Sequence, residues 1–149
     1  MEFVVALSLP RDVASVPFSR QVLDSCLEAL GVTPDTRDDI ALALTEACAN
    51  VILHAGSGDD YAVTAATRAG RCIIEVIDNG HRSGTGGSVR RPDGKVSPLA
   101  ENGRGLQIID AVVDDLTLSG DVRSGTTLHF EKELDWLPGA AARHLLTAD

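Results

Sequence analysis

Residues 40–53 read IALALTEACANVIL, and their only polar side chains are those of one threonine, Glu46 and Asn50. A helix that is apolar on every side is typically buried, and a buried carboxylate is unfavourable unless a partner or a ligand compensates its charge. Glu46 and Asn50 are four residues apart, so they share one face of the helix. A solvent-facing polar patch is the alternative, but Leu42 and Leu53 on roughly the same side favour a functional site.

Length and composition predict one globular domain. The chain has 149 residues, of which 44% are hydrophobic and 23% charged, which is too rich in aliphatic side chains for a disordered protein. We expect a cytoplasmic protein, because no apolar run is long enough to cross a membrane and the N-terminus lacks a basic signal-peptide start. Cys26, Cys48 and Cys72 are predicted to be buried reduced thiols, since their spacing fits neither a metal site nor a disulfide framework. The net charge of −9 argues against direct nucleic-acid binding.

Hydrophobic periodicity predicts strands and helices outward from this central helix. The predicted strands are Glu2–Leu9, Tyr61–Thr67, Arg71–Asp78, Leu116–Ser119 and a last strand from Gly125 to Leu134. The predicted helices are Ser15–Leu30, with Gly31 as its stop, Pro34 to about Ala55, and Gly103 to about Val113. The residues after Pro138 are expected to form a short helix or a loose end. This order predicts an α+β fold, a two-layer sandwich of a mixed β-sheet with helices on one face.

The segment from Gly80 to Asn102 has no apolar periodicity and is rich in glycine and proline. Long segments of this kind are uncommon in compact domains and are often functional lids. Disorder is the alternative, and the two are compatible. Between Arg82 and Arg104 there are five basic residues and two acidic ones, a local charge of +3. We therefore expect an anion to bind there.

Two further polar features fall at the ends of predicted elements. Asp78 ends a strand on the same face as its core residues, so its carboxylate requires a partner, although a simple turn-forming role is the alternative. Gly103, Arg104 and Gly105 begin a helix, where free backbone amides and the helix dipole favour a phosphate.

The oxygen-bearing pair on the central helix suits phosphate chemistry. Asn50 is the kind of oxygen ligand that Mg²⁺ accepts beside phosphates and water. Glu46, one turn away, is suited to take a proton from a water or hydroxyl that attacks a terminal phosphate.

Four motifs stand in order along the chain: Glu46-x3-Asn50, Asp78-x-Gly80, Gly103-x-Gly105 and Gly125-Thr126-Thr127. Together they resemble the motifs of the GHKL ATPases, which have the Bergerat or histidine-kinase-like fold. Within this group the chain most resembles the small anti-sigma-factor serine/threonine kinases, which pair with sigma factors and with STAS-type antagonists. The resemblance implies an ATPase domain at residues 1–135 with an ATP lid at about 81–102, followed by a C-terminal tail at 136–149.

The resemblance also implies a role for each matching residue. Glu46 would be the catalytic base, and Asn50 would hold Mg²⁺ and contact ATP. The other ATP-binding residues would be Asp78 and Gly80 at the adenine, Gly103, Arg104 and Gly105 at the phosphates, and Thr127 at the adenine end. Arg20 is the candidate for the arginine with which the family binds its partners. Arg82 replaces the second glycine of the family's D-x-G-x-G pattern, where it either narrows the pocket or contacts a phosphate.

The resemblance thus implies an Mg·ATP-dependent regulatory kinase that phosphorylates a STAS-type anti-anti-sigma protein and sequesters a sigma factor. Because of Arg82, a catalytically weak, ATP-gated interaction module is the alternative. The catalytic domain of a histidine kinase is disfavoured, since no second helical domain with a phosphoacceptor histidine is present in this chain. The first strand, apolar at Phe3, Val5 and Leu7, is a candidate for pairing with its own copy in a homodimer.

Overall fold

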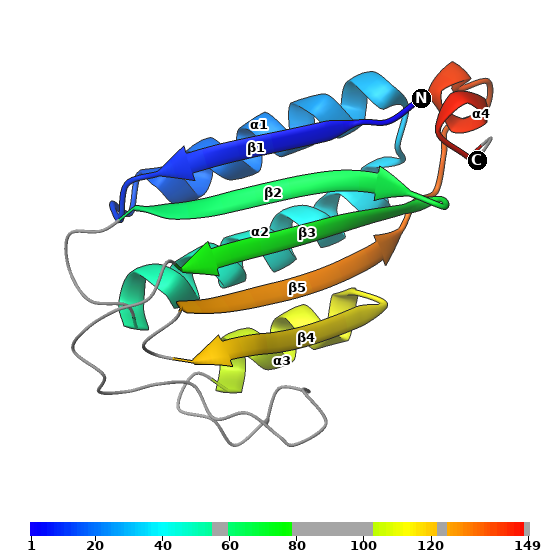
Figure 1. Cartoon of the computed structure of the whole chain (residues 1–149). Helices are drawn as coiled ribbons and strands as arrows, with labels where there is room; N and C mark the ends of the chain where they lie inside the picture. Colours follow the sequence, from blue (N-terminus) through cyan, green and yellow to red (C-terminus); the bar gives the residue numbers. More distant parts are fainter. Residues whose placement is uncertain (55–59, 79–102, 122–124, 148–149) are drawn as a thin grey trace.

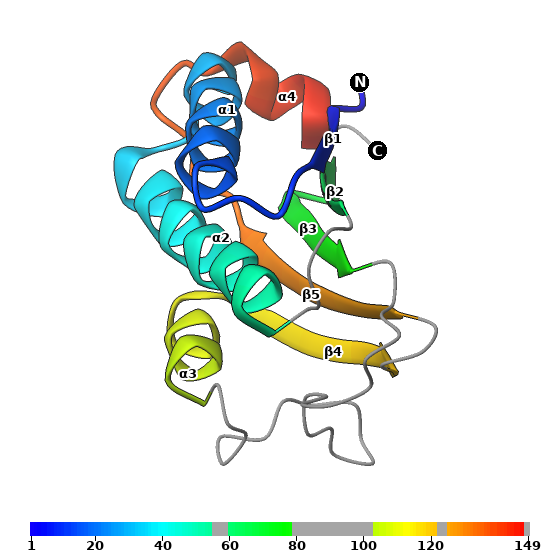
Figure 2. The ribbon, with the colours of Figure 1, turned by 90° about the vertical axis from the view of Figure 1, so that its left-hand side faces the viewer.

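A layer of helices covers one face of a β-sheet in the part of the chain that the computed structural model describes, residues 1–54, 60–78, 103–121 and 125–147 (Figures 1 and 2). The strands are β1 (Val4–Leu9), β2 (Tyr61–Arg68), β3 (Arg71–Asp78), β4 (Asp115–Asp121) and β5 (Gly125–Glu133). The helices are α1 (Ser15–Leu30), α2 (Pro34–His54), α3 (Gly103–Val112) and α4 (Ala141–Thr147). The predicted elements, the α+β class and the two-layer arrangement are thereby confirmed.

The sheet differs from the prediction in one respect, because every strand pair in the described residues is antiparallel and the sheet is not mixed. The strand order is β1-β2-β3-β5-β4. β3 and β4, which are joined through α3, do run parallel to each other. They are not neighbours, however, because β5 lies between them and pairs antiparallel with both. A crossover connection fixes the direction of a strand but does not fix which strand it pairs with.

Helix α2 lies in the middle of the helical layer, between α1 and α3 (Figure 2). One side of it enters the core, where Ala43, Leu44 and Ala47 are completely buried. The prediction that α2 is buried on every side is wrong, since Leu42 is 42% exposed and Leu53 is 75% exposed. The neighbouring helices and the sheet cover three sides of α2, and the fourth side is open to solvent.

The structure confirms the predicted burial for two of the three cysteines, and it decides between the two alternatives for the C-terminal residues. Cys48 and Cys72 are buried and Cys26 is half-buried, and all three are free thiols. Burial raises the pKa of Cys72 to about 12, so this thiol is chemically inert at neutral pH. After Pro138 the chain forms α4, the first of the two expected alternatives, and α4 packs against α1 and β2.

The predicted end of α1 is confirmed. Gly31 has a φ of 93° and ends α1 in the left-handed conformation, with its N–H bonded to the carbonyl of Glu28. No helix among the described residues is long and apolar enough to cross a membrane.

Candidate functional site

The last turns of α2, the end of β3 and the start of α3 lie toward the same end of the molecule (Figures 1 and 2). These elements carry the predicted site residues Glu46 and Asn50, Asp78, and Gly103 to Gly105, respectively. The packing of α3 along α2 brings the glycine turn to the polar face of α2. The fold therefore gathers motifs that are separated by more than a third of the chain.

Within this group, Gly105 lies close to the carboxylate of Glu46. A Cβ atom placed on Gly105 would lie only 3.1 Å from Glu46 Oε1, closer than an ordinary contact. Any larger residue at position 105 would therefore displace the carboxylate by a few tenths of an ångström, whereas glycine lets α3 come this near to it. Glu46 is half-buried and not fully buried, because it borders the open side of α2. A half-buried carboxylate at a helix N-terminus is both positioned and accessible to a ligand.

Asn50 and Arg104 are near neighbours of Glu46 and Gly105 on their own helices. Asn50 is half-buried and follows Glu46 by one turn on the same face of α2. Arg104 is exposed in the first turn of α3, next to Gly105. The two elements that meet at Glu46 thus carry a carboxamide, a guanidinium and a helix N-terminus, which are groups that bind phosphate and its counter-ion.

Asp78 has a buried partner that the sequence analysis missed. Arg11 Nη2 donates to Asp78 Oδ1 in an ion pair, and Arg11 Nη1 donates to the carbonyl of Val51 at 3.0 Å. Only 5% of the Arg11 side chain and 13% of the Asp78 side chain are exposed. Arg11 therefore connects the residues that follow β1 to the last turns of α2 and to the end of β3.

Only the order of the strands in the sheet brings Arg11 to Asp78. Arg11 is 67 residues from Asp78 in the sequence. The register pairs Leu9 with Tyr61 and Tyr61 with Asp78, so the ends of β1 and β3 are aligned across β2. The position of Asp78 on the core face predicted a partner for its carboxylate, but no local pattern points to a residue so far away in the chain.

The register also distinguishes the two threonines at the start of β5. Thr126 pairs with Asp78, and Thr127 pairs with Ile77. Paired residues point to the same face of a sheet, so Thr126 shares the helix-covered face with Asp78, whereas Thr127 lies on the open face. The structure therefore does not bring Thr127 to Asp78. The alternation with the buried Leu128 was the signal for this assignment, because it places residue 126 on the core side.

The other predicted residues have different outcomes. Arg20 is exposed on α1, and its Nη1 lies 3.3 Å from Thr45 Oγ1 on α2. Gly103 is the first residue of α3. Gly80, Arg82 and the lid at about 81–102 lie outside the described residues, as does most of the basic segment.

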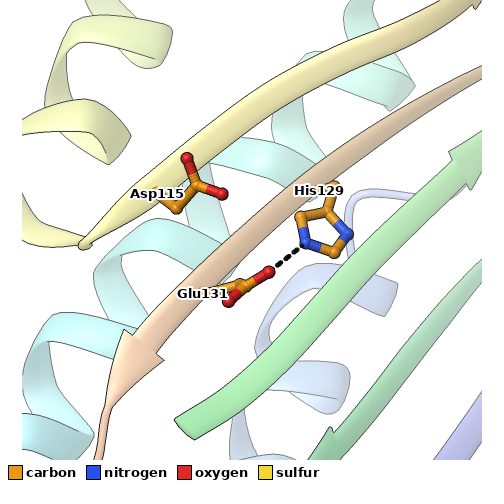
Figure 3. Close-up of side chains that lie close together, drawn as sticks. All are labelled: Asp115, His129 and Glu131. Atoms are coloured by element: carbon orange, nitrogen blue, oxygen red, sulfur yellow. Dashed lines mark hydrogen bonds and ion pairs between the residues drawn. The ribbon is translucent and has the colours of Figure 1, made fainter.

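A second group of ionisable side chains lies on the face of the sheet opposite the helices (Figure 3). His129 Nδ1 lies 3.1 Å from Glu75 Oε2, and His129 Nε2 lies 2.8 Å from Glu131 Oε2. With Asp115, His129 and Glu131 offer donor atoms within 4.8 Å of one another, which is close enough for a metal ion. Both ring nitrogens already have carboxylate partners, however, and these ion pairs account for the arrangement without a metal.

The titration of this second group follows from its contacts. Burial lowers the pKa of His129, but hydrogen bonds and attraction to Glu131 and Glu75 outweigh burial and raise it. The hydrogen bond from His129 lowers the pKa of Glu131. Neither residue belongs to the site on α2, α3 and β3, which lies on the other side of the sheet.

Comparison with known proteins identifies the family. Residues 9–132 match the family model described as a histidine kinase-like ATPase domain. The chain belongs to the histidine kinase-like ATPase family. The match includes α2, β3, α3 and most of β5, and thus all four motifs of the candidate site.

Individual relatives of this histidine kinase-like ATPase are named as protein kinases. The chain is 28% identical over 127 residues to the serine-protein kinase RsbW of Bacillus cereus (strain AH820), with 78% of each chain covered. It is also 28% identical over 125 residues to RsbW of Bacillus thuringiensis (strain Al Hakam). These relatives and the family match confirm the resemblance, and they support ATP use and serine-protein kinase activity at the level of the family.

Among solved structures, this histidine kinase-like ATPase is similar to a chain of the SiaB-SiaC complex from Pseudomonas aeruginosa. The TM-score is 0.57, with 14% sequence identity over 88% of this chain and 89% of that chain. At this identity the likeness supports the fold alone.

Proposed function

We propose that this histidine kinase-like ATPase binds Mg·ATP and transfers the terminal phosphate to a serine or threonine of a STAS-type anti-anti-sigma protein. The observation that carries the proposal is the close approach of Gly105, at the start of α3, to the carboxylate of Glu46 on α2. It brings a carboxylate to a helix N-terminus that suits phosphate. The relatives named as serine-protein kinases support a protein hydroxyl as the acceptor.

In this proposal Glu46 is the catalytic base. Its carboxylate accepts the proton of the acceptor hydroxyl while the hydroxyl oxygen forms a bond to the terminal phosphorus, and the bond to the leaving ADP oxygen breaks. The backbone amides from Gly103 to Gly105 and the Arg104 side chain bind the phosphate oxygens. Asn50 would hold Mg²⁺, whose preference for a few oxygen ligands it fits. When bound, the metal ion would neutralise charge on the phosphates.

The adenine end of the site lies at β3. Asp78 accepts a hydrogen bond from the adenine amino group, and Gly80 and Arg82 border the base or its phosphates. Thr126 is the threonine that supports this end, because it lies opposite Asp78 on the same face of the sheet. We infer that Thr126 takes the role that the family resemblance assigned to Thr127.

The protein partners of the proposed kinase are a sigma factor, which it sequesters, and the STAS-type protein that it phosphorylates. Arg20 supports a partner site on the α1–α2 side, since it is exposed on α1 and lies beside Thr45 of α2. The location of β1 at the edge of the sheet supports a homodimer through β1. The proposed setting is the cytoplasm, where sigma factors act.

Phosphate transfer from labelled ATP to the cognate STAS-type protein tests this function. Glu46→Gln keeps the size of the side chain and removes its basicity, so we expect ATP binding to persist while transfer falls by about 10²-fold or more. Glu28→Gln is the matched control, because Glu28 lies exposed on α1. Transfer by Glu46→Gln at the wild-type rate would exclude Glu46 as the base.

A second candidate is an ATP-gated interaction module with weak catalysis. The replacement of the second adenine-loop glycine by Arg82 favours it. Nucleotide-dependent binding of the partner without any phosphorylation would support this candidate over the kinase.

A further inference from the structure

Arg11 is the most deeply buried arginine in the ion pairs of the described residues, and the proposed chemistry does not use it. Its side chain lies between the last turns of α2 and the end of β3. It donates to a carboxylate and to a carbonyl, and its Nε atom is buried with no hydrogen-bond partner. An arginine in this position carries an uncompensated donor at the border of the candidate adenine site.

Stability alone is a weak explanation for this pair. Removing two charges from water costs free energy that their attraction often fails to recover, and apolar side chains of similar volume are frequently as stable. The unpartnered Nε adds to that cost. The feature that distinguishes Arg11 is its partner, because Asp78 is the residue proposed to recognise the base of the nucleotide.

The ion pair between Arg11 and Asp78 determines which carboxylate oxygen of Asp78 is available to a ligand. Arg11 Nη2 donates to Asp78 Oδ1, and no hydrogen bond or ion pair between described residues involves Asp78 Oδ2. The second contact of Arg11, to the carbonyl of Val51, fixes the guanidinium plane. A carboxylate held in this way by one oxygen presents the other in a fixed direction.

We propose that Arg11 is a positioning residue of the nucleotide site, which holds Asp78 by Oδ1 so that Oδ2 accepts a hydrogen bond from the exocyclic amino group of the base. This inference rests on the proposed binding of ATP. It predicts that Arg11 contributes to affinity only for ligands that carry this amino group. Purine riboside triphosphate, which lacks the 6-amino group and keeps the sugar and phosphates of ATP, isolates that contribution.

The experiment measures the dissociation constants of ATP and of purine riboside triphosphate by calorimetry for the full chain and its variants. For Arg11→Gln we expect the dissociation constant of ATP to rise about tenfold, the usual effect of losing one hydrogen bond to a charged group. The dissociation constant of purine riboside triphosphate should stay unchanged. In an Asp78→Asn background, Arg11→Gln should produce no further loss of ATP affinity, because its effect acts through Asp78.

Arg37→Gln is the matched control. Arg37 also joins an ion pair, with Asp24 at 3.1 Å, and also donates to a carbonyl, that of Val32 at 3.3 Å. It lies near the start of α2, whereas Arg11 contacts the end of the same 21-residue helix. We expect Arg37→Gln to leave both dissociation constants unchanged.

The possible outcomes separate the inference from the function on which it rests. An equal loss of affinity for both nucleotides in Arg11→Gln, or no loss for ATP, would overturn the positioning role. If Arg11→Gln does not fold by circular dichroism, the same comparison is made with Arg11→Lys, which keeps the charge but not the two-point contact. Failure of the wild-type chain to bind ATP would overturn the proposed function and the role of Arg11 together.

Discussion

Replacing Gly105 with alanine should separate stability from activity in this protein. The new Cβ atom would lie 3.1 Å from Glu46 Oε1, and an ordinary contact begins at 3.4 Å. The carboxylate must therefore move by about 0.3 Å or more. Because Glu46 borders the open side of α2, it can move toward solvent without disturbing the core.

The size of the effect on transfer follows from that displacement. A misplacement of about 1 Å costs roughly 10²-fold in rate. If the logarithm of the rate scales with distance, a movement of about 0.3 to 0.5 Å lowers phosphate transfer by about fourfold to tenfold. Stability should change in the opposite direction, because alanine in a helix is favoured over glycine by up to about 1 kcal/mol.

The assay combines two measurements on the same variant. Urea unfolding gives the free energy of unfolding, and single-turnover transfer from labelled ATP to the STAS-type protein gives the rate of the chemical step. The double variant Gly105→Ala with Glu46→Gln should transfer no more slowly than Glu46→Gln alone. Wild-type transfer by a folded Gly105→Ala variant would refute the argument that this glycine positions the catalytic carboxylate.

Three further predictions concern the sheet and its faces. Thr126→Val should weaken ATP binding by about fivefold to tenfold, as expected for a lost hydrogen bond, whereas Thr127→Val should leave it unchanged in the same titration. The pKa of His129 is higher in the folded state than its unfolded-state value of 6.5, so protonated His129 stabilises the fold. This stabilisation is fully present below pH 6.5 and is lost as the pH rises through the folded-state pKa. As the pH rises through this range, the free energy of unfolding from urea titrations should therefore fall for the wild type relative to His129→Gln. A difference between the two proteins that does not change with pH would contradict this prediction. Phe130→Ala should lower the free energy of unfolding by about 3 to 5 kcal/mol, because Phe130 is completely buried, and a loss below about 1 kcal/mol would contradict its place in the core.

The local patterns of the sequence determined which segments form helices and strands. The glycine at position 31 predicted the end of α1, and alternating apolar residues predicted β3 and β5. These signals depend on neighbours within one or two turns of backbone, so the sequence alone carries them. The motifs around Glu46, Asp78 and Gly105 were likewise visible, and with them the family.

The tertiary structure decided which of these residues meet. It paired Asp78 with Arg11 and placed Gly105 against Glu46, and it put β5 between β3 and β4 so that the sheet is antiparallel throughout its described strands. It also left one side of α2 open, although the composition of this helix predicted complete burial. Contacts between residues far apart in the chain depend on strand order and helix packing, and no local pattern encodes either of these.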